Sequence, residues 1–359
     1  MYRNFEYVKT LFLILLFIII IYNTKKENIE YFTSDEIPTL PRPFVNLYDD
    51  KGKKVNVILV SHPFTRDKGT NGTYEQYVEW KNKGINFLGI SSYSEFPGMV
   101  TNPHDSLSNK EMKAWKDYDY MKLFKGWLHC FRDPLKYINK NVPNILISES
   151  DFISESYDIN KDKLDKEYDF MYICLKDNDK CEPGWQSHNR NWELAKKCIE
   201  IMCGKFNLKG LLVGRVNCEL PPNTEHLITI KDFMPKKELI KCYKKSRFLL
   251  LPNIVDASPR VLTEALNYNL PALVNYNILG GWKYITNKTG ELFNNEYDFE
   301  HKLIKLLDNI KANKYEPRKY FTTNYGNSTT GTQLRDFILK HIPNVNFTKN
   351  STKYITTTK

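Results

Sequence analysis

The sequence of 359 residues lacks the cysteine and basic patterns of a metal-binding or nucleic-acid-binding protein. Its seven cysteines include no Cys-x-x-Cys pair, which excludes the common zinc spacing, and their odd number suggests no complete disulfide framework. We therefore expect buried free thiols. The net charge of +10 is spread over scattered lysines, without a long arginine-rich block or a helix-turn-helix pattern. This composition predicts no nucleic-acid partner and favours a basic surface facing anionic lipid or nucleotide phosphate.

One long apolar run stands near the N-terminus. Residues 11–22 read LFLILLFIIIIY, are flanked by basic residues on both sides, and are followed by no small-residue cleavage pattern. A full membrane span needs about 20 apolar residues, so the anchor is short. We expect residues 1–24 to form an uncleaved single-pass anchor that meets the membrane through residues 8–22. A cleaved signal peptide and a hairpin insertion remain alternatives, and the balanced flanking charges leave the orientation open.

The remaining sequence is long enough and apolar enough for two ordinary domains. Residues 25–54 carry three prolines among polar residues and are predicted to be a linker. A polar, lysine-rich stretch, residues 155–166, separates two series of apolar runs. We expect an N-terminal domain over 55–165, a C-terminal domain over 166–325, and a closing helix and loose tail over 326–359.

Short apolar runs of β-branched type alternate with helical patterns along both predicted domains. This alternation predicts an α/β fold of two Rossmann-like, doubly wound domains with parallel sheets. The expected strands are 55–61, 85–90, 144–148, 169–175, 208–213, 248–251 and 271–275, and the expected helices are 74–83, 192–203, 236–244, 259–266, 300–312 and 332–341.

The segment from Asp256 to Glu264 follows a buried strand, where an open α/β sheet binds its ligands. Ser258 is expected to cap the next helix, Pro259 suits its first turn, and Arg260 adds a positive charge beside the exposed amides. Glu264 lies about two turns from Asp256 and can accept the vicinal hydroxyls of a ribose. The segment therefore predicts a site for a diphosphate and a ribose, and the alternative is an ordinarily capped helix with one exposed glutamate.

This spacing resembles the Glu-x7-Glu signature of retaining glycosyltransferases of the family-4 type, which have the GT-B fold. Asp256 replaces the first glutamate, and Asp-Ala-Ser-Pro stands for the usual Glu-Gly-Phe-Gly, so the resemblance is to a divergent member. The likeness covers roughly residues 169–293. It implies that Asp256 contacts the donor sugar, that Ser258, Pro259, Arg260 and Val261 hold the diphosphate, and that Glu264 binds the ribose.

The resemblance also implies basic residues after the first strand of the C-terminal domain. Arg190 is the first choice to neutralise the leaving diphosphate, with Lys176 and Asn191 behind it, and Gly214 and Met234 stand where the family lines its nucleobase pocket. A nucleotide-diphospho-sugar is then the donor, no metal or other cofactor is required, and the acceptor is a glycan, a lipid or a protein.

Two other functions stay open at this point. Asp177-Asn-Asp179 matches the Asp-x-Asp by which metal-dependent GT-A glycosyltransferases hold a divalent cation. A catalytically silent, membrane-anchored sugar- or nucleotide-binding protein would also keep the fold. In the N-terminal domain, His62 and His129 are candidates to face the cleft, and a structural role is the alternative for each.

Overall fold

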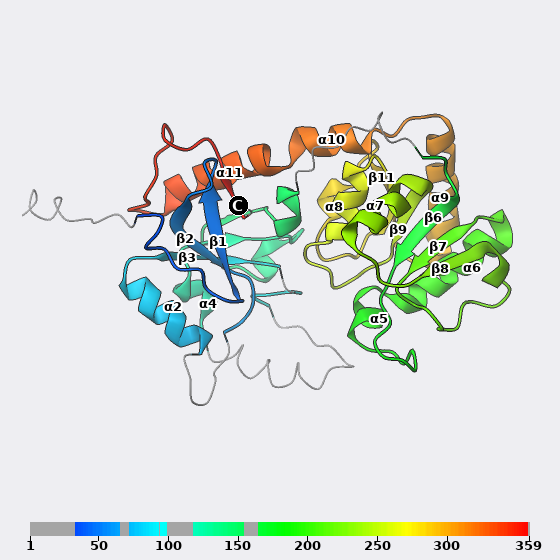
Figure 1. The fold of residues 1–359 in the computed structure, drawn as a ribbon, viewed down its shortest axis with the longest axis horizontal. Coiled ribbons are helices and arrows are strands. Elements are labelled where there is room, and N and C mark those ends of the chain that lie inside the picture. Colours follow the sequence, from blue (N-terminus) through cyan, green and yellow to red (C-terminus); the bar gives the residue numbers. More distant parts are fainter. Residues whose placement is uncertain (1–32, 65–71, 93, 99–117, 154–163, 358–359) are drawn as a thin grey trace, which may run out of the picture.

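The structure is a computed structural model that describes residues 33–64, 72–92, 94–98, 118–153 and 164–357. Two six-stranded sheets, each with its own helices, lie side by side (Figure 1). The predicted α/β class with two domains is confirmed. The predicted membrane anchor lies outside the described residues, and within those residues no helix is long and apolar enough to cross a membrane.

The first sheet has the order β12-β1-β2-β3-β4-β5. Strands β2 to β5 are parallel, whereas β1 runs antiparallel to both β2 and β12. Its strands are β1 (Phe44–Asp49), β2 (Lys54–Val60), β3 (Asn86–Ile90), β4 (Trp127–Leu128), β5 (Asn144–Ile145) and β12 (Ile355–Thr356). Its helical segments are α2 (Thr73–Asn82), α4 (Tyr120–Leu123), η1 (Pro134–Lys136) and η2 (Glu149–Phe152).

Strand β1 lies inside residues 25–54, so the predicted extent of the linker is wrong. The prolines there precede an antiparallel strand whose Phe44 and Leu47 are buried. A tight turn, in which Asp49 N donates to Lys53 O and Gly52 has a φ of 74°, connects β1 to β2. The tail after residue 344 is not loose either, because Ile355 of β12 is buried in the core.

The second sheet is parallel throughout and has the order β11-β10-β9-β6-β7-β8. The chain adds strands on one side of β6 and then returns to add β9 to β11 on the other side. This is the strand order of the dinucleotide-binding Rossmann fold, and its ligand crevice lies outside the carboxyl ends of the two strands at the reversal, β6 and β9. The strands are β6 (Tyr168–Ile173), β7 (Gly210–Val213), β8 (Ile228–Lys231), β9 (Ser246–Leu251), β10 (Ala272–Asn275) and β11 (Gly290–Phe293).

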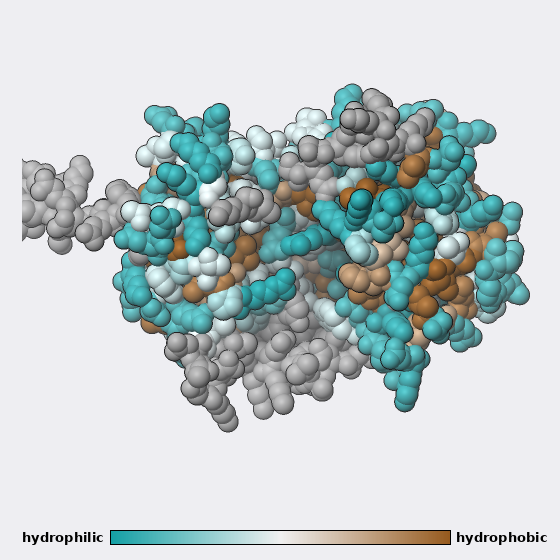
Figure 2. Space-filling model, viewed as in Figure 1, coloured by the Kyte–Doolittle hydropathy of each residue, from teal (hydrophilic) through white to brown (hydrophobic). Residues whose placement is uncertain are grey.

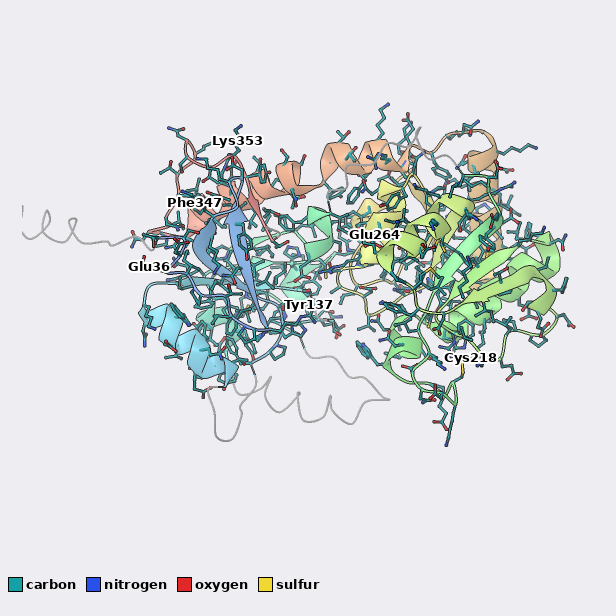
Figure 3. The ribbon with its side chains drawn as sticks, in the orientation of Figure 1. Glu36, Tyr137, Cys218, Glu264, Phe347 and Lys353 are labelled. Atoms are coloured by element: carbon teal, nitrogen blue, oxygen red, sulfur yellow. A yellow bond between two sulfur atoms is a disulfide. The ribbon has the colours of Figure 1, made fainter. Side chains whose placement is uncertain are left out.

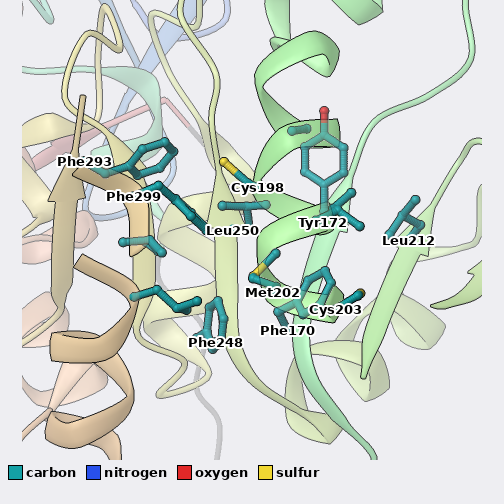
Figure 4. Packing of buried hydrophobic residues seen from close by; sticks show 14 of the residues in the cluster. Phe170, Tyr172, Cys198, Met202, Cys203, Leu212, Phe248, Leu250, Phe293 and Phe299 are labelled. Atoms are coloured by element: carbon teal, nitrogen blue, oxygen red, sulfur yellow. The ribbon is translucent and has the colours of Figure 1, made fainter. Parts of the chain in front are cut away.

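Helices cover both faces of this sheet because alternate strand residues point to opposite sides. On one face, Phe170 and Phe248 of the strands pack with Met202 of α6 and Phe299 of α9 (Figure 4). On the other face, Met171 and its neighbours pack with α7, α8 and α10. The helices are α5 (Trp185–Asn189), α6 (Trp192–Phe206), α7 (Lys236–Lys245), α8 (Arg260–Asn267), α9 (Glu296–Lys311) and α10 (Pro317–Asn324), with single turns η3 (Glu225–Leu227) and η4 (Trp282–Tyr284).

The last helix, α11 (Asn327–His341), returns to the first domain. Its Leu334 and Ile338 are buried with Val57 and Leu59 of β2. The second sheet is therefore inserted in the chain between elements of the first domain, and α10 and α11 bridge the two domains (Figure 1).

A buried ion pair joins the two domains. Lys283 Nζ of η4 lies 2.6 Å from Asp151 Oδ2 of η2, and the two side chains are 7% and 1% exposed. The hydroxyl of Tyr284 and the backbone N–H of Ser148 also donate to the Asp151 carboxylate. The carboxylate is thus fully engaged between the domains.

Cys181 and Cys218 form a disulfide with a Cα–Cα distance of 5.6 Å, so the expectation of buried free thiols is wrong for these two residues. The pair connects the loop after β6 with the loop after β7, across 37 residues of sequence. The other cysteines are free and buried, as expected; they are Cys130, Cys174, Cys198, Cys203 and Cys242.

Candidate functional site

The two predicted catalytic residues meet at the carboxyl ends of β6 and β9. Arg190 follows α5, and Asp256 lies in the loop between β9 and α8. Arg190 Nη1 is 2.6 Å from Asp256 Oδ2, and the side chains are 26% and 14% exposed. This partly buried, charge-assisted hydrogen bond spans the point where the strand order reverses.

The backbone around Arg190 is held from two sides. Asp177 accepts hydrogen bonds from the backbone N–H groups of Gln186 (2.6 Å) and Ser187 (3.0 Å), at the start of α5. The buried hydroxyl of Tyr172 donates to the carbonyl oxygen of Arg190 at 3.1 Å. The guanidinium is therefore presented from a fixed loop, since its neighbours are tied to β6.

The same contacts weaken the Asp-x-Asp metal hypothesis. Asp177 is committed to α5, whereas the Asp179 side chain is 98% exposed and pairs with Lys176 at 2.8 Å. The two carboxylates serve different partners. Among the described residues, no group of three His, Cys, Asp or Glu side chains is arranged to hold a metal ion.

The position of Asp256 depends on a close approach by a glycine. Gly280 N donates to Asp256 O at 2.8 Å, and a Cβ at Gly280 would lie 2.0 Å from the carbonyl oxygen of Ala257. Asn253 Nδ2 also donates to Asp256 Oδ2 at 2.9 Å. No described residue donates to Asp256 Oδ1, which leaves that oxygen available to a ligand hydroxyl.

Ser258 does not cap α8 as expected, because Pro259 occupies the N-cap position and no side chain caps the helix. Ser258 Oγ instead accepts from Ser150 N of the first domain at 3.0 Å and lies 2.5 Å from Ser150 Oγ. Arg260 is exposed and reaches Glu149 at 3.3 Å. The backbone N–H groups of Arg260 and Val261 have no acceptor among the described residues, so they can bind an anion.

The predicted ribose residue Glu264 lies on α8, and the predicted nucleobase residue Met234 lies just before α7. Tyr243 OH of α7 donates to Glu264 Oε2 of α8 at 3.1 Å. Met234 Sδ lies 3.6 Å from Cys242 Sγ, one residue before Tyr243. Figure 3 shows Glu264 on the side of the second domain that lies nearer the first.

The other predicted residues are Lys176, Gly214 and Asn191. They lie after β6, after β7 and directly before α6. Gly214 has a φ of 101° and its carbonyl oxygen accepts from Lys176 N, so it shapes the backbone between β7 and the loop after β6. Asn191 has a left-handed φ of 52° and precedes α6. Their contacts among the described residues do not include Asp256 or Glu264, so the structure does not gather them with that pair.

A cavity of about 390 Å³ lies at the seam between the domains. Ser258 and Arg260 line it from the second domain, and Arg42 and His62 line it from the first. His62 Nδ1 is 2.7 Å from Ser61 Oγ. Burial, and then the nearby Arg42, lower the pKa of His62 to about 4. Arg42 was missed because it precedes β1, in the segment predicted as linker.

His129 is buried at the seam rather than open to the cleft. Its burial, and then the charge of Lys283, lower its pKa to about 4, although a hydrogen bond with Asn144 opposes the shift. In contrast to this buried seam, the visible surface of both domains is mostly hydrophilic (Figure 2).

Acid is expected to destabilise the chain through His129. The imidazole titrates near 6.5 when unfolded and near 4 when folded, so its contribution to stability is complete above pH 6.5 and is lost as pH falls toward 4. We expect a loss of up to about 2 kcal/mol between pH 7 and pH 5 from this residue. Urea unfolding at both pH values measures it. His129→Gln should reduce the loss and the exposed His301→Gln should not, and equal pH dependence in all three proteins would contradict the assignment.

Comparison with solved structures places this arrangement in a known fold. The chain superposes on TarM with a TM-score of 0.54 and 15% identity, covering 74% of this chain and 53% of TarM. A variant of S. aureus TarM in complex with Fondaparinux, alpha-GlcNAc-glycerol and UDP gives a TM-score of 0.54 and 15% identity, over 76% and 53% of the two chains. The chain thus spans about half the length of TarM.

The lipopolysaccharide outer core galactosyltransferase WaaB gives a TM-score of 0.52 and 13% identity, covering 74% of this chain and 72% of WaaB. No protein-family model matches the sequence, and a sequence search of curated proteins finds no match. The likeness is therefore one of fold. The chain has the two-domain architecture of the GT-B glycosyltransferases.

Proposed function

We propose that the chain is a glycosyltransferase that moves a sugar from a nucleotide-diphospho-sugar to a glycan, lipid or protein acceptor. The observation that carries the proposal is the Arg190–Asp256 pair at the strand reversal of a Rossmann-order sheet. Glu264 lies on α8, the helix that follows Asp256. It is far enough along the chain to contact a ribose attached to the diphosphate. The donor lies against the second domain, and the acceptor enters from the first.

Each group has a defined role in this proposal. Arg190 keeps further guanidinium donors beyond the one given to Asp256 and can turn them to the diphosphate. The amides of Arg260 and Val261 face the same charge. Asp256 Oδ1 accepts from a hydroxyl of the donor sugar. Glu264 accepts from the ribose hydroxyls while Tyr243 orients its carboxylate.

The chemical step breaks the bond between the anomeric carbon and the diphosphate oxygen, which leaves with the bonding electrons. The acceptor hydroxyl oxygen bonds to the anomeric carbon, and its proton passes to the departing diphosphate. Arg190 and the helix amides stabilise the charge that develops on the departing oxygen, and a fixed array of donors does this without reorganisation. We propose that transfer retains the anomeric configuration, as the resemblance to family-4 enzymes implies. NMR assignment of the anomer formed from a donor of known configuration tests this.

The solved neighbours support the donor class. The TarM variant was solved with UDP and alpha-GlcNAc-glycerol, and WaaB is named a galactosyltransferase. UDP-sugars are therefore the first donors to test, followed by GDP-sugars. We also propose that residues 8–22 hold the enzyme at a membrane, which fractionation of the full chain against a chain that begins at residue 25 tests.

Glu264→Ala is expected to raise the KM for the donor about 10- to 100-fold, because a hydrogen bond to a charged group contributes about 1.5–3 kcal/mol. The measurement is release of the nucleotide diphosphate from a panel of UDP- and GDP-sugars. Glu300→Ala on α9, on the other face of the sheet, is the matched control and should leave KM unchanged. An unaltered KM in Glu264→Ala would contradict the assignment of Glu264 to the ribose.

The same assay separates the two other functions. Binding of the donor without any release of nucleotide diphosphate would mean a silent binding protein. Loss of release on adding a chelator would instead support the metal-dependent mechanism through Asp177 and Asp179. The proposed mechanism predicts release that a chelator does not change.

A further inference from the structure

The second domain contains another cavity, of about 600 Å³, on the α6 side of the sheet. It lies between α6 and the loops that follow β6 and β7, which the Cys181–Cys218 disulfide ties together. Its lining includes neither Arg190, Asp256 nor Glu264. Figure 3 shows Cys218 at the lower edge of the second domain, well away from Glu264. The cavity is therefore separate from the proposed donor site.

Arg215 places a buried positive charge in the wall of this cavity. The residue is 2% exposed. Its Nη1 donates to Ser187 Oγ at 3.1 Å and approaches Leu175 O at 3.5 Å and Cys174 Sγ at 3.6 Å. Its Nε is buried and has no acceptor in the part of the chain that the structure describes. Among the described residues no carboxylate lies within 4.0 Å of this guanidinium.

Burying a cation without a counter-ion costs free energy unless a partner supplies the opposite charge and hydrogen bonds. Neutral hydroxyl and carbonyl groups satisfy only one side of the Arg215 guanidinium. The remaining N–H groups form the planar donor edge that matches a carboxylate or a phosphate. The unfilled hydrogen-bonding capacity at the cavity wall therefore points to an anionic ligand.

The surroundings of Arg215 indicate what the anion is attached to. The guanidinium carbon lies 4.5 Å from the ring centroid of Trp192, which also lines the cavity. Trp192 is the first residue of the 15-residue helix α6, whose N-terminal amides favour negative charge. Leu220, Pro221 and Pro222 add an apolar wall. A flat ring can pack against these side chains while its anionic group reaches Arg215.

We propose that this cavity binds a small molecule in which a carboxylate or phosphate is attached to a ring, with Arg215 holding the anion. The site is independent of the proposed donor site and of glycosyl transfer.

Calorimetric titration of the full-length chain with phenyl phosphate, benzoate and inorganic phosphate tests the proposal. Phenyl phosphate or benzoate is expected to bind at least about tenfold more tightly than inorganic phosphate, because only the ring compounds use the apolar wall. Whichever of the two binds better identifies the anion. Equal affinity for inorganic phosphate and both ring compounds would overturn the ring requirement.

Variants of single residues show where the ring compound binds. Arg215→Gln is expected to reduce the affinity for the tighter-binding ring compound at least about tenfold, since it removes a charge-assisted hydrogen bond. Arg247→Gln, at an exposed site elsewhere on the domain, and Arg190→Gln, at the donor site, should leave the affinity unchanged. A loss caused by Arg190→Gln and not by Arg215→Gln would place the ligand at the donor site and overturn the proposal.

A second variant covers the case in which Arg215→Gln does not fold. Leu220→Trp enlarges a half-buried side chain at the cavity wall and should block the ring compounds while the chain keeps its thermal midpoint. Undiminished binding to a folded Leu220→Trp protein would contradict the site. Donor turnover by that variant should match the wild type, so failure here does not bear on the proposed glycosyl transfer.

Discussion

Arg190→Ala is expected to lower kcat for donor turnover by about 10²- to 10³-fold, the loss that follows removal of one donor to a developing negative charge. The guanidinium interacts with the diphosphate more strongly as the glycosidic bond breaks, so the effect falls on kcat more than on KM. Initial rates of nucleotide diphosphate release at saturating UDP-sugar measure it.

Two further variants sharpen the test. Arg190→Lys keeps the charge but not the planar donor edge, so it should recover part of the lost rate. Arg247→Ala, an exposed residue of β9 whose side chain is 55% exposed, should leave the rate unchanged. A kcat of Arg190→Ala within about threefold of the wild type would show that this arginine does not stabilise the leaving group.

Asp151→Ala is expected to reduce the free energy of unfolding by roughly 3–5 kcal/mol. The substitution leaves the Lys283 ammonium, 7% exposed, without its carboxylate at the seam between the domains. Tyr284 and Ser148 lose their acceptor at the same time. Urea unfolding measured at pH 7 gives the size of the effect.

The double variant Asp151→Asn with Lys283→Met separates charge from packing. It leaves no buried charge, so it should lose less stability than Asp151→Ala alone, and the coupling follows from a double-mutant cycle. Glu238→Ala breaks an exposed ion pair with Lys241 and should change nothing measurable. If Asp151→Ala costs less than about 1 kcal/mol, the seam does not depend on this pair.

Four strands of the second sheet, β6, β7, β9 and β10, could be predicted closely because they are buried on both faces, whereas β8 and β11 were not among the expected strands. FLLL of β9 and DFMYICL around β6 carry an unbroken apolar pattern that the sequence alone displays. Strand β1 alternates and follows prolines, and β12 has only two residues, so local pattern did not reveal either one. Both depend on pairing between the ends of the chain.

The spacing of Asp256 and Glu264 is visible within one short stretch of sequence, and Arg190 was predicted from the family resemblance. Other contacts of the candidate site could not be predicted. The contact of Ser258 with Ser150 joins residues 108 positions apart, and the disulfide joins residues 37 positions apart. No pattern in a single sequence specifies such pairs. Ser258 therefore looked like a helix cap, although its hydroxyl connects the domains.

The insertion of the second sheet limits how the cleft can open. The chain crosses between the domains twice, once between η2 and β6 and once between α10 and α11. At the second crossing, Gly326 N donates to the carbonyl oxygen of Asp151 at 2.8 Å, so the residue that holds Lys283 also touches this crossing. Two connections between the domains restrict their relative rotation, and Asp151 lies beside the second one, where it contacts both Lys283 and Gly326.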